Sequence, residues 1–281
     1  PASTTPPPHG PMTRSSDRQA AGAVLDESPH VATTLSPTAP AVTRRVHLTL
    51  QGKGGVGKSF VSALIAQFYR ANGRPITCLD TDPVNATLSG YAALGAARVD
   101  LLEGSKVSER RFDQMMERLL AEDTDFVVDN GAASFIPLSN YLIENRAVEL
   151  LAESGRQVVV HTVVTGGQAL RDTLSGFASL AEQLPREASL VVWLNEFFGD
   201  IAANGKGFEA MRAYETHRDR VTGIVRIPRQ TSDTFGRDVE LMLDRKLTFE
   251  EVAASPDFGL MARQRLAMVR RGIFDQLQHI V

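Results

Sequence analysis

From residue 44 onward, short runs of apolar residues alternate with longer segments in which apolar residues recur every three or four positions. The short runs predict buried strands, and the longer segments predict helices that pack by one face. The predicted strands are 46–50, 76–79, 126–128, 158–164, 190–194 and 223–227, and the predicted helices include 139–153 and 168–184. Strands that alternate with helices predict an α/β fold, in which a mainly parallel central sheet is flanked by helices and binds ligands at its carboxyl edge.

Residues 1–43 have a different composition. Eight of the 14 prolines fall at or before Pro40, in a stretch that is also rich in Ser, Thr and Ala. Such a stretch buries too little apolar surface to offset the entropy lost on ordering. We therefore expect a disordered tail over 1–43, either a docking or targeting arm or a plain extension, and one folded domain over 44–281.

Composition and charge exclude several classes of protein. The formal net charge of -3 over 281 residues argues against a protein coated in nucleic acid, although a local basic patch is compatible with it. Cys78 is the only cysteine in the sequence, which excludes an internal disulfide and a CxxC site. The sequence has no run of eighteen apolar residues and no apolar secretory core in its first forty positions. We therefore expect no transmembrane segment and a cytoplasmic location.

The turn after the first predicted strand carries the most specific motif, GKGGVGKS at 52–59. It satisfies G-x-x-x-x-G-K-[ST] between a strand and a helix, where backbone N–H groups curl around phosphate oxygens. Lys58 is predicted to contact the β- and γ-phosphates, and the Ser59 hydroxyl to bind Mg²⁺. The chain has 25 arginines and five lysines, and two of the five lysines lie in this octapeptide. The predicted nucleotide-binding residues here are Gly52, Gly54, Gly55, Val56, Gly57, Lys58, Ser59 and Phe60.

Three carboxylates at the ends of predicted strands are candidates for the chemistry beside this loop. Asp80 and Asp82 follow the strand 76–79, and Asp129 follows the strand 126–128. Asp129 can hold the magnesium shell through water. An ordinary turn at the end of a strand is the alternative interpretation of Asp80 and Asp82.

The string KGGVGKS, with Lys53 ahead of the motif lysine, resembles the deviant Walker A box of the ParA/MinD group of P-loop ATPases. The resemblance implies a three-layer P-loop NTPase fold, and a Lys53 that reaches across a dimer to the phosphates of the other subunit. LDTDPVNAT at 79–87 is similar to a segment of partition ATPases, although one residue fewer separates Pro83 from Asn85. This similarity implies that Asp80 lies by the magnesium and that Asp82 orients the attacking water.

The resemblance to the ParA/MinD group also implies where the adenine base of the nucleotide binds. Asn195, after the strand 190–194, corresponds to an asparagine that hydrogen-bonds the adenine edge, and Pro228 lies in the loop that packs on the base. No N-K-x-D guanine motif is present, so the predicted cofactors are ATP and Mg²⁺. His161 has no Ser or Cys arrangement near it, and we interpret it as a packed strand residue.

Across 44–281 the sequence resembles the TraL family of conjugative-plasmid transfer proteins. The long matching strings are LQGKGGVGKS (50–59), DTDPVNAT (80–87), VVDNGAASFIPLSNYLI (127–143), HTVVTGGQAL (161–170), VVWLN (191–195) and RQRLAMVRRGIFDQL (263–277). The family implies a ParA-like nucleotide-binding protein of a conjugation or plasmid-maintenance system. Phe60 stands where partition ATPases usually carry a second threonine.

The predicted function is slow ATP hydrolysis by a nucleotide-switched homodimer that works with conjugation or plasmid-maintenance proteins. Three alternatives stay open: a chromosome or plasmid partition ATPase, a nucleotide-gated binding module with little turnover, and a small-molecule transferase on the same scaffold. Lys53, Lys58 and Asp82 are the predicted catalytic residues, and Ser59, Asp80 and Asp129 are the predicted metal ligands.

The last predicted helix, about 260–280, has one continuous apolar stripe and several arginines. The stripe consists of Ala262, Leu266, Val269, Ile273 and Leu277. Arg263 and Arg270 flank the stripe, Arg271 stands further round, and Arg265 lies on the opposite side. The stripe predicts packing onto the sheet. The alternatives are an amphipathic membrane anchor, or a face that binds non-specific DNA with Arg265 and Arg271 exposed.

Overall fold

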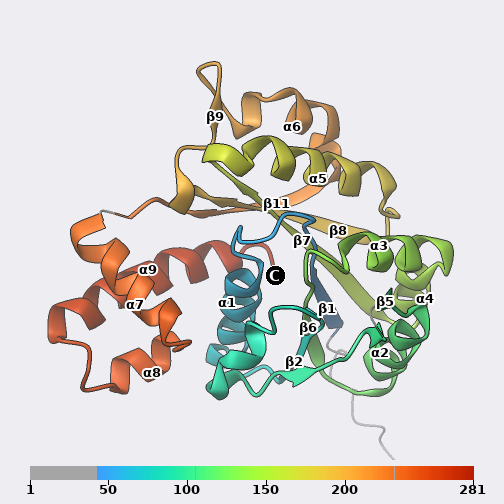
Figure 1. Ribbon diagram of the computed structural model, residues 1–281, viewed down its shortest axis with the longest axis horizontal. Coiled ribbons are helices and arrows are strands. Elements are labelled where there is room, and N and C mark those ends of the chain that lie inside the picture. Colours follow the sequence, from blue (N-terminus) through green and yellow to red (C-terminus); the bar gives the residue numbers. More distant parts are fainter. Residues whose placement is uncertain (1–42, 105, 231) are drawn as a thin grey trace, which may run out of the picture. The chain divides into compact units, whose positions relative to one another are not determined.

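The computed structural model describes residues 43–104, 106–230 and 232–281, so the predicted tail lies outside the described residues except for Thr43. Its main feature is a parallel seven-stranded sheet in the order β11-β8-β7-β1-β6-β2-β3 (Figure 1). The strands of this sheet are β1 (Arg44–Thr49), β2 (Ile76–Asp80), β3 (Ala97–Arg98), β6 (Asp125–Asp129), β7 (Arg156–Thr165), β8 (Ala188–Asn195) and β11 (Val221–Ile227). Two short antiparallel pairs stand apart from it, β4 (Leu102–Glu103) with β5 (Lys106–Val107) and β9 (Ala202–Ala203) with β10 (Lys206–Gly207).

Helices cover both faces of the sheet, as the sequence predicts. They are α1 (Lys58–Ala71), α2 (Glu109–Ala121), α3 (Phe135–Glu144), α4 (Ala147–Glu153), α5 (Leu170–Gln183), α6 (Arg212–His217), α7 (Arg237–Asp244), α8 (Phe249–Ala254) and α9 (Leu260–Leu277). Helices α2 to α6 pack on one face, against side chains such as Val46 and Leu48 of β1. Helices α1, α7, α8 and α9 pack on the other, against side chains such as Val159 and Trp193. Because both faces are covered, β6 is buried at every position, which explains why its central residues 126–128 are consecutive apolar residues rather than an alternation.

The position of β1 fixes where a ligand can bind. β1 pairs with β6 on one side and β7 on the other. The chain builds one half of the sheet after β1 and then crosses β1 to build the other half. Loops that follow strands on the two sides of such a reversal diverge and leave a crevice at the carboxyl ends of the strands. The loop after β1 therefore opens into this crevice.

Two predicted helices differ from the structure. The predicted single helix 139–153 is wrong, because α3 ends at Glu144 and α4 begins at Ala147. Arg146 lies between them with a φ of 49°, a left-handed conformation that ends a helix. The apolar periodicity continues across the break because both helices bury residues in the same core. The C-terminal helix also ends at Leu277 rather than near residue 280.

Helix α9 packs on the body of the protein through its apolar stripe. Leu266, Ile273 and Leu277 are buried, which confirms the packing prediction. The prediction that Arg265 is exposed is wrong, because its Nε donates to Asp238 Oδ2 of α7 at 2.6 Å and its side chain is 22% exposed. Arg271 is exposed. Within the described ranges, no helix combines the length and apolar character that a membrane span requires.

A buried chain of hydrogen bonds runs between α1 and the sheet. His47 Nδ1 lies 2.9 Å from His161 Nε2, and His47 Nε2 lies 2.7 Å from the Tyr69 hydroxyl. Trp193 Nε1 donates to His161 Nδ1 at 3.0 Å. Since the indole N–H can only donate, His161 carries its proton on Nε2 and donates to His47, which in turn donates to Tyr69. His161 is fully buried and is the packed strand residue that we expected.

Both imidazoles of this chain are held in the neutral form. Burial lowers the pKa of His161 to about 3, and burial lowers the pKa of His47 well below its usual value. In the unfolded chain each imidazole takes up a proton near pH 6.5. In the folded protein the two imidazoles become protonated only at a far lower pH. The free energy of unfolding contributed by the pair is therefore fully present above about pH 6.5 and is lost as the pH falls.

We expect the variant His161→Gln to show a weaker pH dependence of stability than the wild type. The glutamine amide offers one acceptor and a donor, so it can replace the neutral imidazole while removing one titrating group. In urea titrations between pH 7 and 4.5, the slope of the unfolding free energy should be smaller by up to about 1.4 kcal/mol per pH unit. Equal slopes for the two proteins would contradict the neutral buried pair.

Candidate nucleotide-binding site

The loop that follows β1 is held in a tight path at the carboxyl end of the central strand. Gly57, which precedes α1, has a φ of 103°, a region that residues with a Cβ avoid. A Cβ on Gly57 would also lie 2.8 Å from Asn195 Nδ2 at the end of β8. Asn195 Nδ2 donates to the Val56 carbonyl at 2.9 Å. Glycine is therefore required here for two reasons: it can adopt the positive φ, and it leaves room for the end of β8 to approach the loop.

Lys58 spans this loop. Its Nζ donates to the Lys53 carbonyl at 3.0 Å, and the residue is 8% exposed. Burial lowers the pKa of Lys58, whereas the negative charges of Asp129 and Asp82 raise it. An ammonium held in this way can exchange the carbonyl for a phosphate oxygen bound by the loop.

Lys53 is held by a residue that the sequence analysis did not identify. Lys53 Nζ forms an ion pair with Asp172 Oδ2 of α5 at 2.8 Å, and the two side chains are 45% and 56% exposed. An ion pair so open to water contributes little, so Lys53 can exchange Asp172 for another anion at small cost. The sequence contains no signal that joins these two distant positions.

Asp80 and Asp82 are fixed by hydrogen bonds in the segment after β2. Asp80 is buried and accepts from the Asp82 N–H at 3.1 Å and from the Ser89 N–H at 2.8 Å. Asp82 Oδ1 accepts from the N–H groups of Val84 and Asn85 at 2.9 and 3.0 Å. Asp82 thus closes a tight turn with one oxygen, and its second oxygen accepts no hydrogen bond from the described residues.

Asp129 is the residue of the site whose surroundings most clearly favour a bound cation. It ends β6 directly opposite Asp80 in the register of the sheet, and it is 1% exposed. Its Oδ2 is buried without a hydrogen-bond partner among the described residues, while its Oδ1 lies 3.1 Å from Ser62 Oγ. Burial raises the pKa of Asp129 to about 7, with the charge of Asp80 adding to the rise and hydrogen bonds from Ser59 and Ser62 opposing it.

These residues fit a magnesium ion. Mg²⁺ in nucleotide sites is held by one or two carboxylates, a hydroxyl, water and phosphate oxygens. Asp129 offers a buried oxygen that is unpaired among the described residues, Asp80 lies beside it, and Ser59 follows Lys58 in the first turn of α1. Among the described residues, no three His, Cys, Asp or Glu side chains converge as a ligand set.

Two hollows meet at the loop. A hollow of about 600 Å³ is lined by the predicted residues Gly54, Gly55, Gly57, Lys58, Ser59, Phe60 and Asp82. A second, of about 360 Å³, is lined by Gly55, Gly57, Phe60, Asn195 and Pro228 together with many apolar side chains. The shared lining by Gly55, Gly57 and Phe60 suits a ligand with a charged end in the first hollow and a flat apolar end in the second. Lys53 and Val56 instead line a third hollow of about 370 Å³. Gly52, Asp80 and Asp129 are not among the lining residues of these three hollows.

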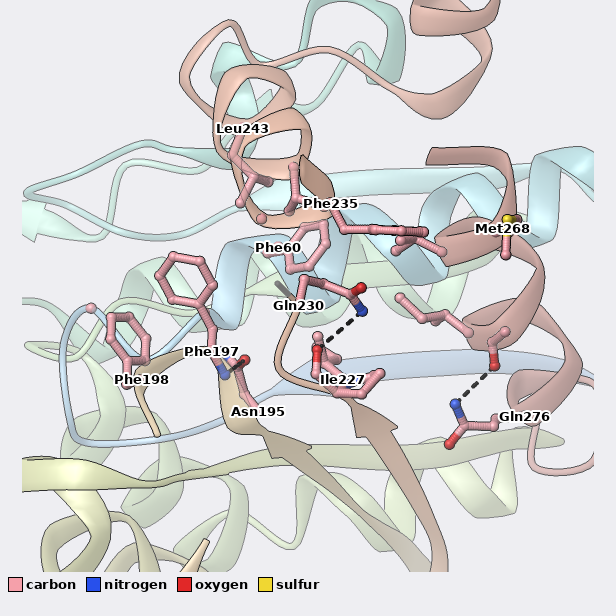
Figure 2. Close-up of a pocket in the computed structure, with 18 residues that line it drawn as sticks. Phe60, Asn195, Phe197, Phe198, Ile227, Gln230, Phe235, Leu243, Met268 and Gln276 are labelled. Atoms are coloured by element: carbon pink, nitrogen blue, oxygen red, sulfur yellow. Dashed lines mark hydrogen bonds between the residues drawn. The ribbon is translucent and has the colours of Figure 1, made fainter. Parts of the chain in front are cut away.

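Figure 2 shows the residues that line the apolar hollow. Phe60 of α1, Phe197 of the turn after β8, and Phe235 before α7 surround it, and Leu243 and Met268 close it from the C-terminal helices. None of these aromatic residues except Phe60 was predicted, because they come from three separate segments that only the fold brings together. Both polar atoms of the Asn195 amide form hydrogen bonds. Nδ2 donates to the Val56 carbonyl, and Oδ1 accepts from the Phe197 N–H at 3.2 Å.

A glycine pair after β7 forms another part of the site that the sequence analysis missed. A Cβ on Gly166 would lie 2.2 Å from the Gly199 carbonyl oxygen, so the loops after β7 and β8 touch through their backbones. Thr165 Oγ1 donates to the Asn195 carbonyl at 2.8 Å in the same place. Two adjacent glycines after a predicted strand were the signal in the sequence that could have identified this contact. They let the loop after β7 pack against the turn that follows Asn195.

Comparisons with known proteins identify the family of the chain. The family model described as the CobQ/CobB/MinD/ParA nucleotide binding domain matches residues 48–237. Two curated Escherichia coli proteins named TraL are similar to the chain. One is 51% identical over 83% of this chain and 97% of the relative, and the other is 48% identical over 84% and 98%.

Solved structures are more distant. The MinC:MinD cell division protein complex of Aquifex aeolicus matches 81% of this chain and 94% of that chain, with 14% identity and a TM-score of 0.47. A plasmid partition protein from Borrelia burgdorferi matches 72% of this chain and 97% of that chain, with 14% identity and a TM-score of 0.41. Likeness at this level supports no statement about function.

The phosphate loop after β1, in a parallel sheet covered by helices, defines a P-loop nucleotide-binding protein. The chain belongs to the TraL family, within the CobQ/CobB/MinD/ParA nucleotide-binding domains.

The contact at Gly166 can be tested by adding the Cβ that it excludes. We expect Gly166→Ala to lower the free energy of unfolding by about 2–3 kcal/mol, because one backbone must move away from the other. Gly207→Ala is the matched control, since a Cβ there meets no atom within 4 Å, and it should change stability by less than about 0.5 kcal/mol. Urea denaturation measures both, and equal effects of the two substitutions would contradict the close approach.

Proposed function

We propose that the chain binds ATP with Mg²⁺, hydrolyses it slowly, and acts as a nucleotide-switched homodimer in the cytoplasm with proteins of plasmid conjugal transfer or maintenance. The observation that carries the proposal is the loop itself. Lys58 is held across it by the Lys53 carbonyl, and the buried Asp129 carboxylate, which interacts with Ser59 of the loop, has one oxygen without a hydrogen-bond partner among the described residues. Membership of the TraL family supports the cellular setting.

Each residue of the site has a role in this proposal. The N–H groups of the loop and the Lys58 ammonium bind the β- and γ-phosphates, with the dipole of α1 adding positive potential. Ser59, Asp129 and Asp80 hold the metal shell, and bound Mg²⁺ supplies neutralisation of the charge that develops on the phosphates. The free oxygen of Asp82 orients a water molecule toward the γ-phosphate, while its other oxygen keeps the carboxylate fixed to the turn.

The apolar hollow is the proposed place of the base. Phe60, Pro228 and the aromatic residues around them offer flat apolar walls of the kind that stack on a purine. Asn195 reads the adenine edge in this proposal, which requires that its amide exchange the Phe197 or Val56 contact for the base.

Lys53 is the residue on which the dimer proposal depends. It is more exposed than Lys58, it lines a different hollow, and its weak ion pair with Asp172 leaves it available to a second subunit. DNA binding through α9 stays a hypothesis that now depends on Arg270 and Arg271, because Arg265 pairs with Asp238 and Arg263 donates to the Ser255 carbonyl.

Replacing Lys58 tests the nucleotide site. We expect Lys58→Ala to weaken ATP binding at least about 100-fold, because a charged contact to the phosphates is lost. Isothermal titration with Mg·ATP measures the affinity, and circular dichroism checks the fold. Lys206→Ala is the control, since Lys206 lies in the exposed β9–β10 pair and should not affect binding. Unchanged affinity in the Lys58 variant would refute the site.

Replacing Lys53 tests the dimer separately. We expect Lys53→Ala to bind ATP within about threefold of the wild type but to lose ATP-dependent dimerisation, because its ammonium acts on the partner's nucleotide. Asp172→Ala, which removes the other half of the ion pair, should dimerise at least as well as the wild type. Sedimentation with a non-hydrolysable ATP analogue measures both. If Lys53→Ala dimerises normally, Lys53 has no role across the interface.

A further inference from the structure

Lys246 occupies a backbone position that favours glycine. Helix α7 ends at Asp244, and Lys246 follows with a φ of 54°. The N–H groups of Lys246 and Leu247 donate to the carbonyls of Leu243 and Met242 at 3.1 and 3.0 Å, which closes the end of the helix. Glycine is the residue most often found at this left-handed position, because any Cβ is crowded there. A lysine in its place suggests that the side chain has a use that offsets the strain.

The side chain of Lys246 reaches the phosphate end of the candidate site. It lines the hollow of about 600 Å³ that Lys58, Ser59 and Asp82 also line. Its stem lies along Gly90, where an added Cβ would be 3.4 Å from Lys246 Cγ. Its Nζ lies 5.9 Å from the centre of the Tyr91 ring. The stem is therefore supported on one side, and the ammonium is held at the hollow.

Lys246 has no carboxylate partner among the residues that the structure describes. Within the described part of the chain, no Asp or Glu oxygen lies within ion-pair distance of its Nζ, whereas Lys53 is paired with Asp172. Lys58 and Lys246 are the two cationic residues that line the hollow, and the chain has only five lysines in all. A cation without a partner beside a phosphate loop is suited to an anion from solution.

We propose that Lys246 binds the phosphate chain of the nucleotide, as a second cation in addition to Lys58. This inference rests on the proposed ATP binding, and it adds a residue from the C-terminal part of the fold to the site. Leu243, one helical turn before Lys246, lines both the apolar hollow and the phosphate hollow. Helix α7 thus extends from the base to the phosphates, and Lys246 lies at its phosphate end.

Because of the backbone strain at Lys246, one substitution is expected to change stability and ATP affinity in opposite directions. Lys246→Gly removes both the cation and the crowded Cβ, so the protein without nucleotide should unfold at a higher temperature while its affinity for ATP falls about tenfold. Binding of adenosine, which has no phosphate, should be unchanged. Lys246→Met keeps an apolar stem and should lose affinity for ATP to the same extent, whereas Lys246→Arg should stay within about threefold of the wild type.

Arg146→Gly is the matched control. Arg146 is also a non-glycine residue with positive φ, at the junction of α3 and α4, and it lines none of the three hollows described above. This variant should gain thermal stability and bind ATP as the wild type does. Isothermal titration gives the ATP affinities, ligand-observed NMR gives those of adenosine, and calorimetry gives the unfolding temperatures.

The outcomes separate the two proposals. If the wild type binds ATP and both Lys246→Gly and Lys246→Met bind it equally well, the role of Lys246 is refuted and the proposed function stands. Equal losses for ATP and adenosine would also refute it, because Lys246 would then shape the pocket rather than contact phosphate. If the wild type binds no ATP, the proposed function fails and the role of Lys246 fails with it.

Discussion

The hydrogen bond from the Asn195 amide to the Val56 carbonyl joins the loop after β1 to the end of β8. It can form only because Gly57 has no side chain, since a Cβ there would collide with the amide nitrogen. The turn that carries Asn195 is itself seated by the backbone contact between Gly166 and Gly199. Three strand ends, those of β1, β7 and β8, are thereby locked together at the place where the sheet reverses. A rigid loop at this place keeps its N–H groups directed at one point, which is what binding of a phosphate requires.

The electrostatics of the site follow from burial. Asp80 and Asp129 end neighbouring strands at the same level of the sheet, so two carboxylates are buried side by side. Burial, with the charge of Asp80 adding to it, raises the pKa of Asp129 to about 7, although Ser59, Ser62 and Lys58 oppose the rise. Such an arrangement costs stability unless a cation joins it. Under the proposed function, a divalent ion bound with the phosphates would offset this cost.

The C-terminal helices complete the site rather than merely cover the sheet. Helices α7 and α9 supply Leu243 and Met268 to the apolar hollow, and α7 is tied to α9 by the pair of Asp238 and Arg265. Figure 1 shows these helices beside α1, which begins at the phosphate loop. A ligand that spans both hollows touches the first and the last parts of the folded domain. Under the proposed function, nucleotide binding and the packing of α7 and α9 would therefore be coupled.

The parallel α/β fold, six of its strands, the phosphate loop and the acids beside it could all be predicted from the sequence. These features are local: an apolar run of five residues, or a glycine-rich octapeptide between a strand and a helix, has the same meaning wherever it lies. The tertiary structure alone decided which distant residues meet. The Lys53–Asp172 pair, the Arg265–Asp238 pair, the aromatic walls of the hollow and the approach of Lys246 to the phosphate side each join segments far apart in the chain. The apolar periodicity of the sequence also continued through the break between α3 and α4 at Arg146. Such a pattern shows which side chains are buried, but it does not show whether one helix continues. Contacts of this kind depend on how the helices are placed over the sheet, and no single segment of the sequence contains that information.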